Sequence, residues 1–188
     1  SWPMLEVLHR ILRSPGLWLV LGLLLIAYLL VGWVESVGGP EAIRVRYGVL
    51  APAITSSIQV LVAPTPFPSD VICIAQGALY GFWFALGLNW LGWWLASHIE
   101  FLLGRRLRGD FDLESRMRRL PRWLTRFPVD HPVFLIFVRQ VPWAGGHLST
   151  FVPGAMGVPF LRSAWCNAIG IDPAAILTAA VGAGLLAL

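Results

Sequence analysis

Gly16–Val34 is a run of 19 residues without a charged side chain. At about 1.5 Å per residue, a helix of this length reaches about 28 Å, enough to cross a hydrocarbon core about 30 Å thick. Trp18 and Trp33 lie near its ends, where tryptophans meet the membrane interface. The run is longer than the apolar part of a signal peptide and no small-residue cleavage site follows it, so we expect a retained transmembrane helix.

The composition extends this prediction to the whole chain. Of its 188 residues, 57% are hydrophobic and only 13% are charged, against roughly 25% charged residues in soluble domains. So few charges cannot cover a water-exposed surface of this size. The composition therefore excludes a soluble enzyme, a disordered protein and a nucleic-acid-binding module, and it predicts an all-α polytopic membrane protein.

A proline cluster interrupts the next apolar region. Val49–Ala63 is apolar but rich in hydroxyl groups, and it runs into Pro64, Pro68 and a third proline between them. The following residues, 71–103, would form a helix about 50 Å long, which is too long for one crossing, so we expect a break near Gly81. This pattern predicts a re-entrant hairpin and then a crossing helix. Such a hairpin needs protein or a water-filled cavity around its unpaired backbone groups.

The same order of features recurs in the second half of the chain. A short apolar run, a break, a returning segment and a crossing segment follow each other: Val133–Val141, Pro142 with Gly145 and Gly146, Phe151–Leu161, and Ser163–Leu188. If each half holds one hairpin and one crossing, the second hairpin enters from the opposite side. The expected fold is therefore an inverted repeat of a re-entrant helical hairpin plus a transmembrane helix, a design associated with transport.

The predicted organisation has four parts along the chain. They are an N-terminal segment with the first transmembrane helix, the first hairpin with its crossing, a basic amphipathic loop, and the second hairpin with its crossing: residues 1–34, 48–103, 104–131 and 132–188.

The positive charge is concentrated in the loop. Residues 105–126 hold eight arginines against three acids, a net charge of +5, so the rest of the +4 chain is −1. Arginine-rich loops usually face the cytoplasm. We therefore expect this loop and the N-terminus on the cytoplasmic side of the membrane, which we expect to be a bacterial inner (plasma) membrane. Two readings remain open for the loop: a helix on anionic lipid headgroups, or one packed on the protein itself. The proposed anionic-lipid surface consists of Arg116, Arg118, Arg119, Arg122 and Arg126.

Ionisable residues in apolar surroundings are the candidates for function, because familiar catalytic and phosphate-binding motifs such as HExxH, GxSxG and the P-loop are missing from the sequence. An Asp or Arg at the centre of a membrane helix costs about 2.5–3.5 kcal/mol, so it needs a partner, water or a role. Asp70 closes the proline cluster and Arg139 precedes Pro142. We hypothesise that both face one internal cavity; a structural ion pair is the alternative.

Four further residues are secondary candidates. His147 could bind phosphate or carry a proton, or be a structural histidine. Glu100 could serve transport or snorkel towards the cytoplasm. Asn167 and Asp172 lie in the last crossing, where Pro173 predicts a kink.

Several motifs together resemble the DedA/VTT superfamily, also called the SNARE-associated Golgi protein family. In the first half they are Ala63–Asp70 (APTPFPSD), Gln76–Gly81 (QGALYG) and Gly104–Leu107 (GRRL); in the second half they are Arg139–Pro142 (RQVP), Pro159–Arg162 (PFLR) and Asn167–Gly170 (NAIG). The resemblance covers roughly residues 48–175. It implies paired re-entrant helices and lipid translocation, either phospholipid scrambling or movement of a lipid phosphate, in some members driven by the proton motive force.

The resemblance also implies roles for single residues. Asp70 falls on the family's acidic position after the proline turn, and Arg139 falls on its first essential-type arginine. The second arginine of the bacterial pattern is replaced by Gly145, and an upstream acid has only Ser57–Gln59 nearby. The chain is therefore more similar to the VTT-like branch, and proton coupling stays open.

The leading hypothesis is a phospholipid scramblase or lipid-phosphate flippase that moves headgroups through a polar cavity between the hairpins. The alternatives are a proton- or ion-coupled carrier of a small solute and a non-transporting membrane scaffold. The expected partners are phospholipid or lipid phosphate and an anionic membrane surface, with no nucleic acid, metal or cofactor; a homo-oligomer stays open.

Overall fold

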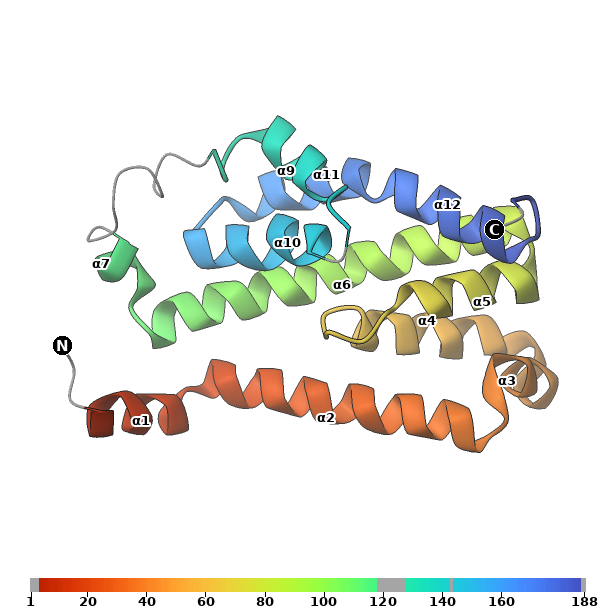
Figure 1. The fold of residues 1–188 in the computed structure, drawn as a ribbon, viewed down its shortest axis with the longest axis horizontal. Helices are drawn as coiled ribbons and strands as arrows, with labels where there is room; N and C mark the ends of the chain where they lie inside the picture. The colour runs from red at the N-terminus through yellow and green to blue at the C-terminus, as the bar shows by residue number, and fades with distance from the viewer. Residues whose placement is uncertain (1–3, 118–127, 143, 187–188) are drawn as a thin grey trace. The chain divides into compact units, whose positions relative to one another are not determined.

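The structure is a computed structural model that describes residues 4–117, 128–142 and 144–186. Helices are the regular secondary structure of these residues, as predicted, and turns join them (Figure 1). Three helical stretches are long and apolar enough to cross a membrane, namely Pro15–Ser36, Gly39–Val62 and Phe160–Gly182. The first of them confirms the helix expected from the uncharged run.

The helices follow one another with short connections. In chain order they are α1 (Met4–Arg13), α2 (Pro15–Ser36), α3 (Gly39–Tyr47), the 3-10 turn η1 (Gly48–Leu50), α4 (Ala51–Val62), α5 (Asp70–Tyr80), α6 (Phe82–Asp110), α7 (Leu113–Met117), α9 (Pro132–Val138), α10 (Gly145–Met156), α11 (Phe160–Gly170) and α12 (Asp172–Gly182). They form two compact units. Unit 1 holds residues 1–22 and 97–167, and unit 2 holds residues 23–96 and 168–188.

The first predicted helical pair is present in unit 2. Helices α4 and α5 pack against each other on either side of the proline-rich turn. Gly81 then separates α5 from α6 with a φ of 80°, a conformation that glycine adopts without the penalty of a side chain. Both breaks therefore lie where the sequence placed them.

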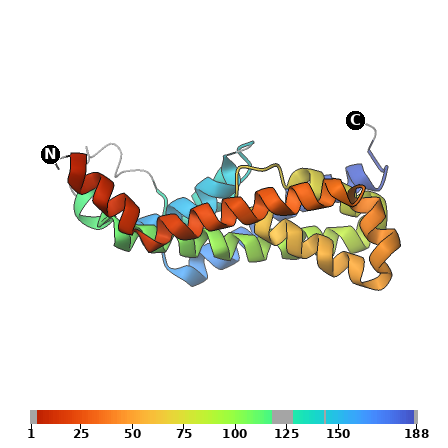
Figure 2. The same cartoon turned by 90° about the horizontal axis from the view of Figure 1, so that it is seen from below.

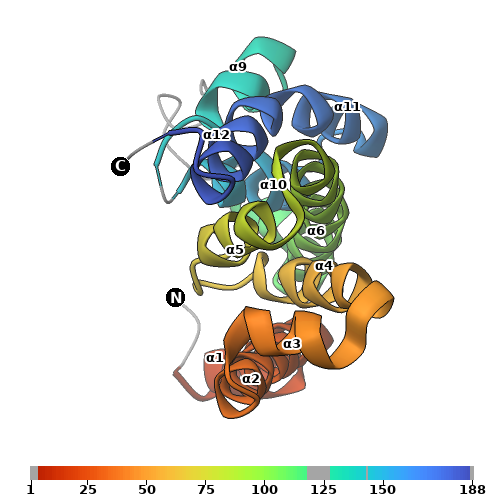
Figure 3. The same ribbon diagram turned by 90° about the vertical axis from the view of Figure 1, so that its right-hand side faces the viewer.

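The connection expected between the first helix and this pair is itself helical. Helix α3 begins after Gly38, whose φ is 99°, and carries Pro40 in its first turn. It packs against α4 and α5, and the short turn η1 joins it to α4 (Figure 3). Glu41 and Arg44 form an exposed ion pair on it, and α3 begins the candidate span Gly39–Val62.

The second half differs from its prediction in one place. Gly145 and Gly146 do not form the break: α9 ends at Val138, and both glycines belong to the first turn of α10. The crossing expected over residues 163–188 corresponds to the candidate span Phe160–Gly182, in which α11 and α12 meet at Ile171, next to the kink that Pro173 predicts. Pro173 lies in the first turn of α12, where its missing N–H leaves no hydrogen bond unmade.

Each unit contains one crossing of helices at a pair of glycines. In unit 2, a Cβ on Gly77 of α5 would lie 2.8 Å from the carbonyl oxygen of Ala179 in α12, and Gly182 of α12 faces α5 just as closely. In unit 1, Gly104 of α6 and Gly154 of α10 each lie against the other helix's backbone. Such close approach allows strong van der Waals packing between membrane helices.

A buried carboxylate ties the start of α2 to the end of α6 within unit 1. The side chain of Asp110, only 11% exposed, accepts hydrogen bonds from the hydroxyl of Ser14 (2.8 Å) and the backbone N–H of Gly16 (2.7 Å). It therefore satisfies an N–H group that the first turn of α2 leaves unpaired. Figure 2 shows α1 and α2 as separate helices that meet at an angle at this junction.

Replacing Asp110 by alanine should lower the free energy of unfolding by about 2 kcal/mol, because Ser14 and Gly16 both lose a charged acceptor. Titration with a denaturing detergent in mixed micelles measures this quantity. Asp112→Asn is the matched control, since Asp112 is exposed and its φ of 47° suits asparagine. Equal stability of the two variants would contradict the assigned role of Asp110.

Most of the proposed anionic-lipid surface is not described by the structure. Arg118, Arg119, Arg122 and Arg126 lie outside the described residues, and Arg116 is placed only as a backbone position in α7. The amphipathic loop therefore stays a prediction.

Candidate functional site

The turn after α9 positions Arg139. Helix α9 begins at Pro132, and the ring nitrogen Nδ1 of His131 accepts a hydrogen bond from the backbone N–H of Val133 (3.3 Å). Arg139 is the residue at which this short helix ends, and the turn runs on through Pro142 to α10. The arginine is half-buried, so its permanent charge requires polar partners.

Two neutral side chains supply those partners. The Nη1 atom of Arg139 donates to Oδ1 of Asn167 in α11 (2.7 Å) and to Oγ of Ser149 in α10 (3.2 Å). Both partners are buried, with Ser149 fully excluded from solvent. Among the described residues, only this nitrogen of the guanidinium makes hydrogen bonds, so the Nε and Nη2 donors remain available for a ligand.

The orientation of the Asn167 amide is determined by its surroundings. Its Nδ2 atom donates to the backbone carbonyls of Ser163 (2.8 Å) and Ser149 (3.2 Å), which can only accept. The oxygen Oδ1 must therefore face Arg139, and the Ser149 hydroxyl approaches it as well (3.1 Å). This fixed acceptor holds one edge of the guanidinium in place.

A second cluster of side chains surrounds the carboxylate of Glu100. Glu100 of α6 is buried, with 7% of its surface exposed, and its Oε2 accepts a short hydrogen bond from the hydroxyl of Thr150. Nδ1 of His147 lies 3.2 Å from the same oxygen, and the His147 side chain is 43% exposed. Helix α10 therefore covers the Glu100 carboxylate, and both of the roles considered for this residue stay predictions.

Consecutive residues of α10 connect the two clusters. Ser149 holds the cation Arg139, while Thr150 holds the carboxylate of Glu100. Among the described residues, the guanidinium is therefore bound by neutral groups and not by a carboxylate. Such an arrangement can receive an anionic group.

The comparisons with known proteins agree with this membrane architecture. The VTT domain family matches residues 67–184, which is more than half of the chain and includes Arg139, Glu100, His147 and Asn167. The chain belongs to the VTT domain family. It is an integral membrane protein of the DedA/SNARE-associated group, with the three candidate spans given above. Neither the curated proteins nor the solved structures contain a match.

The VTT domain also includes Asp70, which lies in unit 2 whereas Arg139 lies in unit 1. Asp70 is the first residue of α5 and is exposed, and Ser69 rather than Asp70 occupies the capping position. Its carboxylate still lies near the positive end of the α5 dipole. The hypothesis that it shares a cavity with Arg139 stays a prediction.

The turn residues of the VTT domain have different environments. Pro64 is half-buried and Pro68 exposed in the first turn, and Pro142 is exposed in the second. Gly145 is buried and lies so close to the backbone of Arg139 that a Cβ would collide with the Arg139 carbonyl, whereas a Cβ on Gly146 would meet nothing within 4 Å. Gly145 therefore allows the tight turn that positions the arginine.

The remaining candidate, Asp172, is exposed at the start of α12 and belongs to unit 2. Ser149 and Thr150 complete the site in unit 1 but were not predicted from the sequence. The signal for them was a pair of hydroxyl residues five and four positions before Gly154 within an apolar segment.

Proposed function

We propose that this VTT domain protein moves the phosphorylated headgroup of a lipid across the membrane, and that Arg139 contacts the phosphate. The observation that carries the proposal is the half-satisfied guanidinium: its Nη1 is held by Asn167 and Ser149, and its other nitrogens make no hydrogen bond to the described residues. A planar guanidinium presents paired N–H donors that match two phosphate oxygens.

The neutral partners of Arg139 support a phosphate ligand. Asn167 and Ser149 fix the direction of the side chain without cancelling its charge. A contacting carboxylate would compete with the phosphate, and Glu100 is instead occupied by Thr150 and His147. His147, nearly half exposed, is the second residue that we assign to the headgroup.

The proposed transport path rests on an inverted repeat. Each half of the chain contains a helix, a turn and a returning helix, α4 with α5 and α9 with α10. Each returning helix crosses a helix of the other half at a glycine pair, α5 on α12 and α10 on α6. We propose that both pairs are re-entrant, that Asp70 serves the first as Arg139 serves the second, and that residues 105–126 and the N-terminus face the cytoplasm.

Arg139→Gln should reduce lipid movement at least tenfold, because glutamine removes the charge while keeping the length of a polar side chain. Liposomes containing the purified protein and a fluorescent phospholipid measure movement as the fraction of label that becomes accessible to an external quencher. The control is Arg162→Gln, which removes a charge from the same unit at an exposed pair with Asp130.

An unchanged rate in Arg139→Gln, or an equal loss in Arg162→Gln, would contradict the site. Uptake of a soluble solute in response to a pH gradient, without lipid movement, would instead favour a carrier. Loss of cellular function on neutralising the loop arginines alone, with the hairpin variants active, would favour a scaffold.

A further inference from the structure

Helix α1 has an apolar face and a polar face. Its ten residues, Met4–Arg13, read MLEVLHRILR. At about 100° per residue, the apolar positions 4, 5, 7, 8, 11 and 12 fall on one side of the helix, and the polar positions 6, 9, 10 and 13 fall on the other. A helix with this separation, and with basic residues on its polar face, is typical of one that lies in the plane of a membrane surface.

The apolar face of α1 is open at both ends of the helix. Met4 is 88% exposed and Leu12 is 58% exposed, so the described part of the protein covers neither side chain. On the polar face, His9 and Arg13 are exposed as well. Apolar side chains next to a transmembrane helix gain free energy when they enter the acyl-chain boundary of the membrane.

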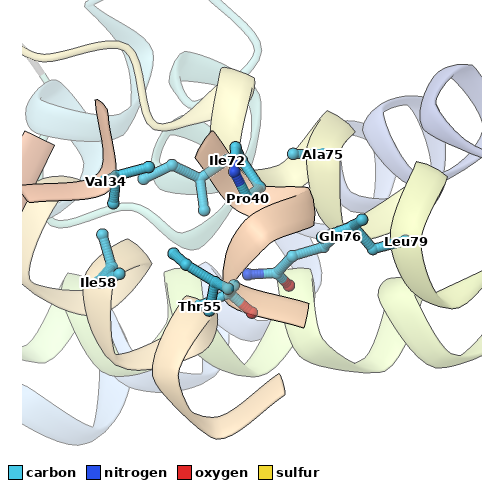
Figure 4. A pocket seen from close by; sticks show the side chains of 9 residues that line it. Val34, Pro40, Thr55, Ile58, Ile72, Ala75, Gln76 and Leu79 are labelled. Atoms are coloured by element: carbon cyan, nitrogen blue, oxygen red, sulfur yellow. The ribbon is translucent and has the colours of Figure 1, made fainter. Parts of the chain in front are cut away.

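The span that follows α1 is held by the protein near each of its ends. In unit 2, Val34 packs against the cluster that contains Ile43 and Ile58, and Figure 4 shows Val34 and Ile58 around the small pocket at this end. In unit 1, Asp110 binds the backbone of Gly16. Since Gly16 begins the uncharged run, α1 leaves α2 at the boundary of the hydrocarbon core.

A proline and two hydrogen bonds determine how α1 meets α2. Pro15 is the first residue of α2 and disfavours a continuous helix through Ser14. The Ser14 hydroxyl oxygen accepts from the backbone N–H of Leu17 (3.1 Å), so it caps α2. The indole Nε1 of Trp18 donates to the backbone carbonyl of Leu12 (2.8 Å). These contacts hold the angle between the two helices that Figure 2 shows.

Trp18 indicates which face of α1 meets the lipid. Its side chain is exposed on α2, most of whose surface is open to lipid. A tryptophan near the end of a span lies at the membrane interface, with its ring in the apolar region and its N–H bound to a polar group. Because this indole is bound to Leu12, the apolar side of α1 continues the lipid-facing surface of α2.

Three arginines give the same junction a positive charge. Arg10 and Arg13 share the polar face of α1. Arg106 of α6 pairs with Asp110 (3.5 Å), and its side chain is 54% exposed. The acids are Glu6 on α1 and Asp110, so the net charge is positive. Anionic headgroups complement this charge.

We propose that α1 lies in the membrane interface as an in-plane anchor, with its apolar face among the acyl chains and with Arg10, Arg13 and Arg106 on the headgroups of anionic phospholipid. This anchor is built on the start of α2, so it is distinct from the arginine surface predicted for the central loop. It is also independent of the transport function proposed for Arg139, because it requires no movement of lipid.

Spin labels on two neighbouring residues test the orientation of α1 in the full-length protein in lipid vesicles. Leu12→Cys places a label on the apolar face and Arg13→Cys places one on the polar face; both positions are exposed, whereas the native Cys73 and Cys166 are buried. Oxygen concentrates in the hydrocarbon, and a nickel chelate stays in water. The ratio of collisions with oxygen to collisions with the chelate should be at least about threefold higher at position 12 than at position 13.

Spin-labelled lipids test the charge of the anchor. A fluorophore on Leu12→Cys is quenched by phosphatidylglycerol or by phosphatidylcholine that carries a nitroxide near the headgroup. Phosphatidylglycerol should be preferred by about fivefold for each arginine that reaches the headgroups. Arg10→Gln/Arg13→Gln should remove most of this preference. The control Arg44→Gln/Arg46→Gln removes two exposed arginines from α3 in unit 2 and should preserve it.

Equal access of the nickel chelate to positions 12 and 13 would place both faces of α1 in water and overturn the proposal. Shielding of position 12 from both oxygen and the chelate would also overturn it and would indicate a protein partner, such as a second copy of this chain. Equal quenching by the two lipids, or a preference that survives Arg10→Gln/Arg13→Gln, would refute the headgroup contact. These measurements do not depend on lipid movement, so their failure and that of the Arg139 site are distinguishable.

Discussion

Gly154→Ala should lower the free energy of unfolding by about 3 kcal/mol, although alanine normally favours a helix over glycine by about 1 kcal/mol. The added methyl group would collide with the carbonyl of Phe101 in α6, which is backbone and cannot rotate away. Helix α10 must then move off α6, and Thr150 moves away from Glu100. Detergent titration of the folded fraction measures the loss, and lipid movement should fall with it.

Gly109→Ala is the matched control for this prediction. Gly109 also lies in α6, but a Cβ there would meet nothing within 4 Å. This variant should therefore be as stable as the wild type or slightly more stable. If Gly154→Ala were equally well tolerated, the close crossing of α6 and α10 would be refuted.

The helix boundaries of the first half could be predicted because local chemistry sets them. The prolines of residues 64–68 cannot continue a helix, and Gly81 adopts a conformation that other residues avoid. The predicted return helix 71–80 is therefore observed as 70–80. Such signals act within a few residues and need no knowledge of the rest of the fold.

The boundaries set by tertiary contacts could not be predicted in this way. Gly145 and Gly146 read as a break because glycine disfavours helices, yet α10 begins with them since Gly145 must approach the Arg139 backbone closely. Helix α6 continues past the expected end at Leu103, where its last residue, Asp110, is bound by Ser14 and Gly16. The partners in both cases come from distant parts of the sequence.

The candidate site was predictable only as a set of charges. Arg139 and Glu100 stand out because ionised groups are costly in apolar segments. Their neutral partners do not, since serine and threonine in membrane helices also bond to the preceding turn, as Thr150 does to the carbonyl of Gly146 (2.8 Å).

Glu100→Ala should be the most destabilising change among the ionisable residues, with a loss of about 3 kcal/mol. The variant removes the acceptor of the Thr150 hydroxyl and the partner of His147, and it leaves a cavity at a buried position. Glu100→Gln preserves an acceptor for Thr150, so it should lose less. The loss in Glu100→Gln measures the contribution of the charge, and the further loss in Glu100→Ala measures that of the side-chain shape and its hydrogen bond.

The double variant Glu100→Ala/Arg139→Ala tests whether the two charges interact without touching. Coulomb attraction is strong in a poorly hydrated interior. The sum of the losses in unfolding free energy of the two single variants should therefore exceed the loss of the double variant by about 1–2 kcal/mol, with little dependence on salt. The exposed pair Glu41–Arg44 provides the comparison, because its coupling should be about 0.5 kcal/mol and should fall as salt is added. Additive losses for Glu100 and Arg139 would contradict this coupling. They would mean that Asn167 and Ser149 alone hold the arginine and that Glu100 does not affect its binding of a phosphate.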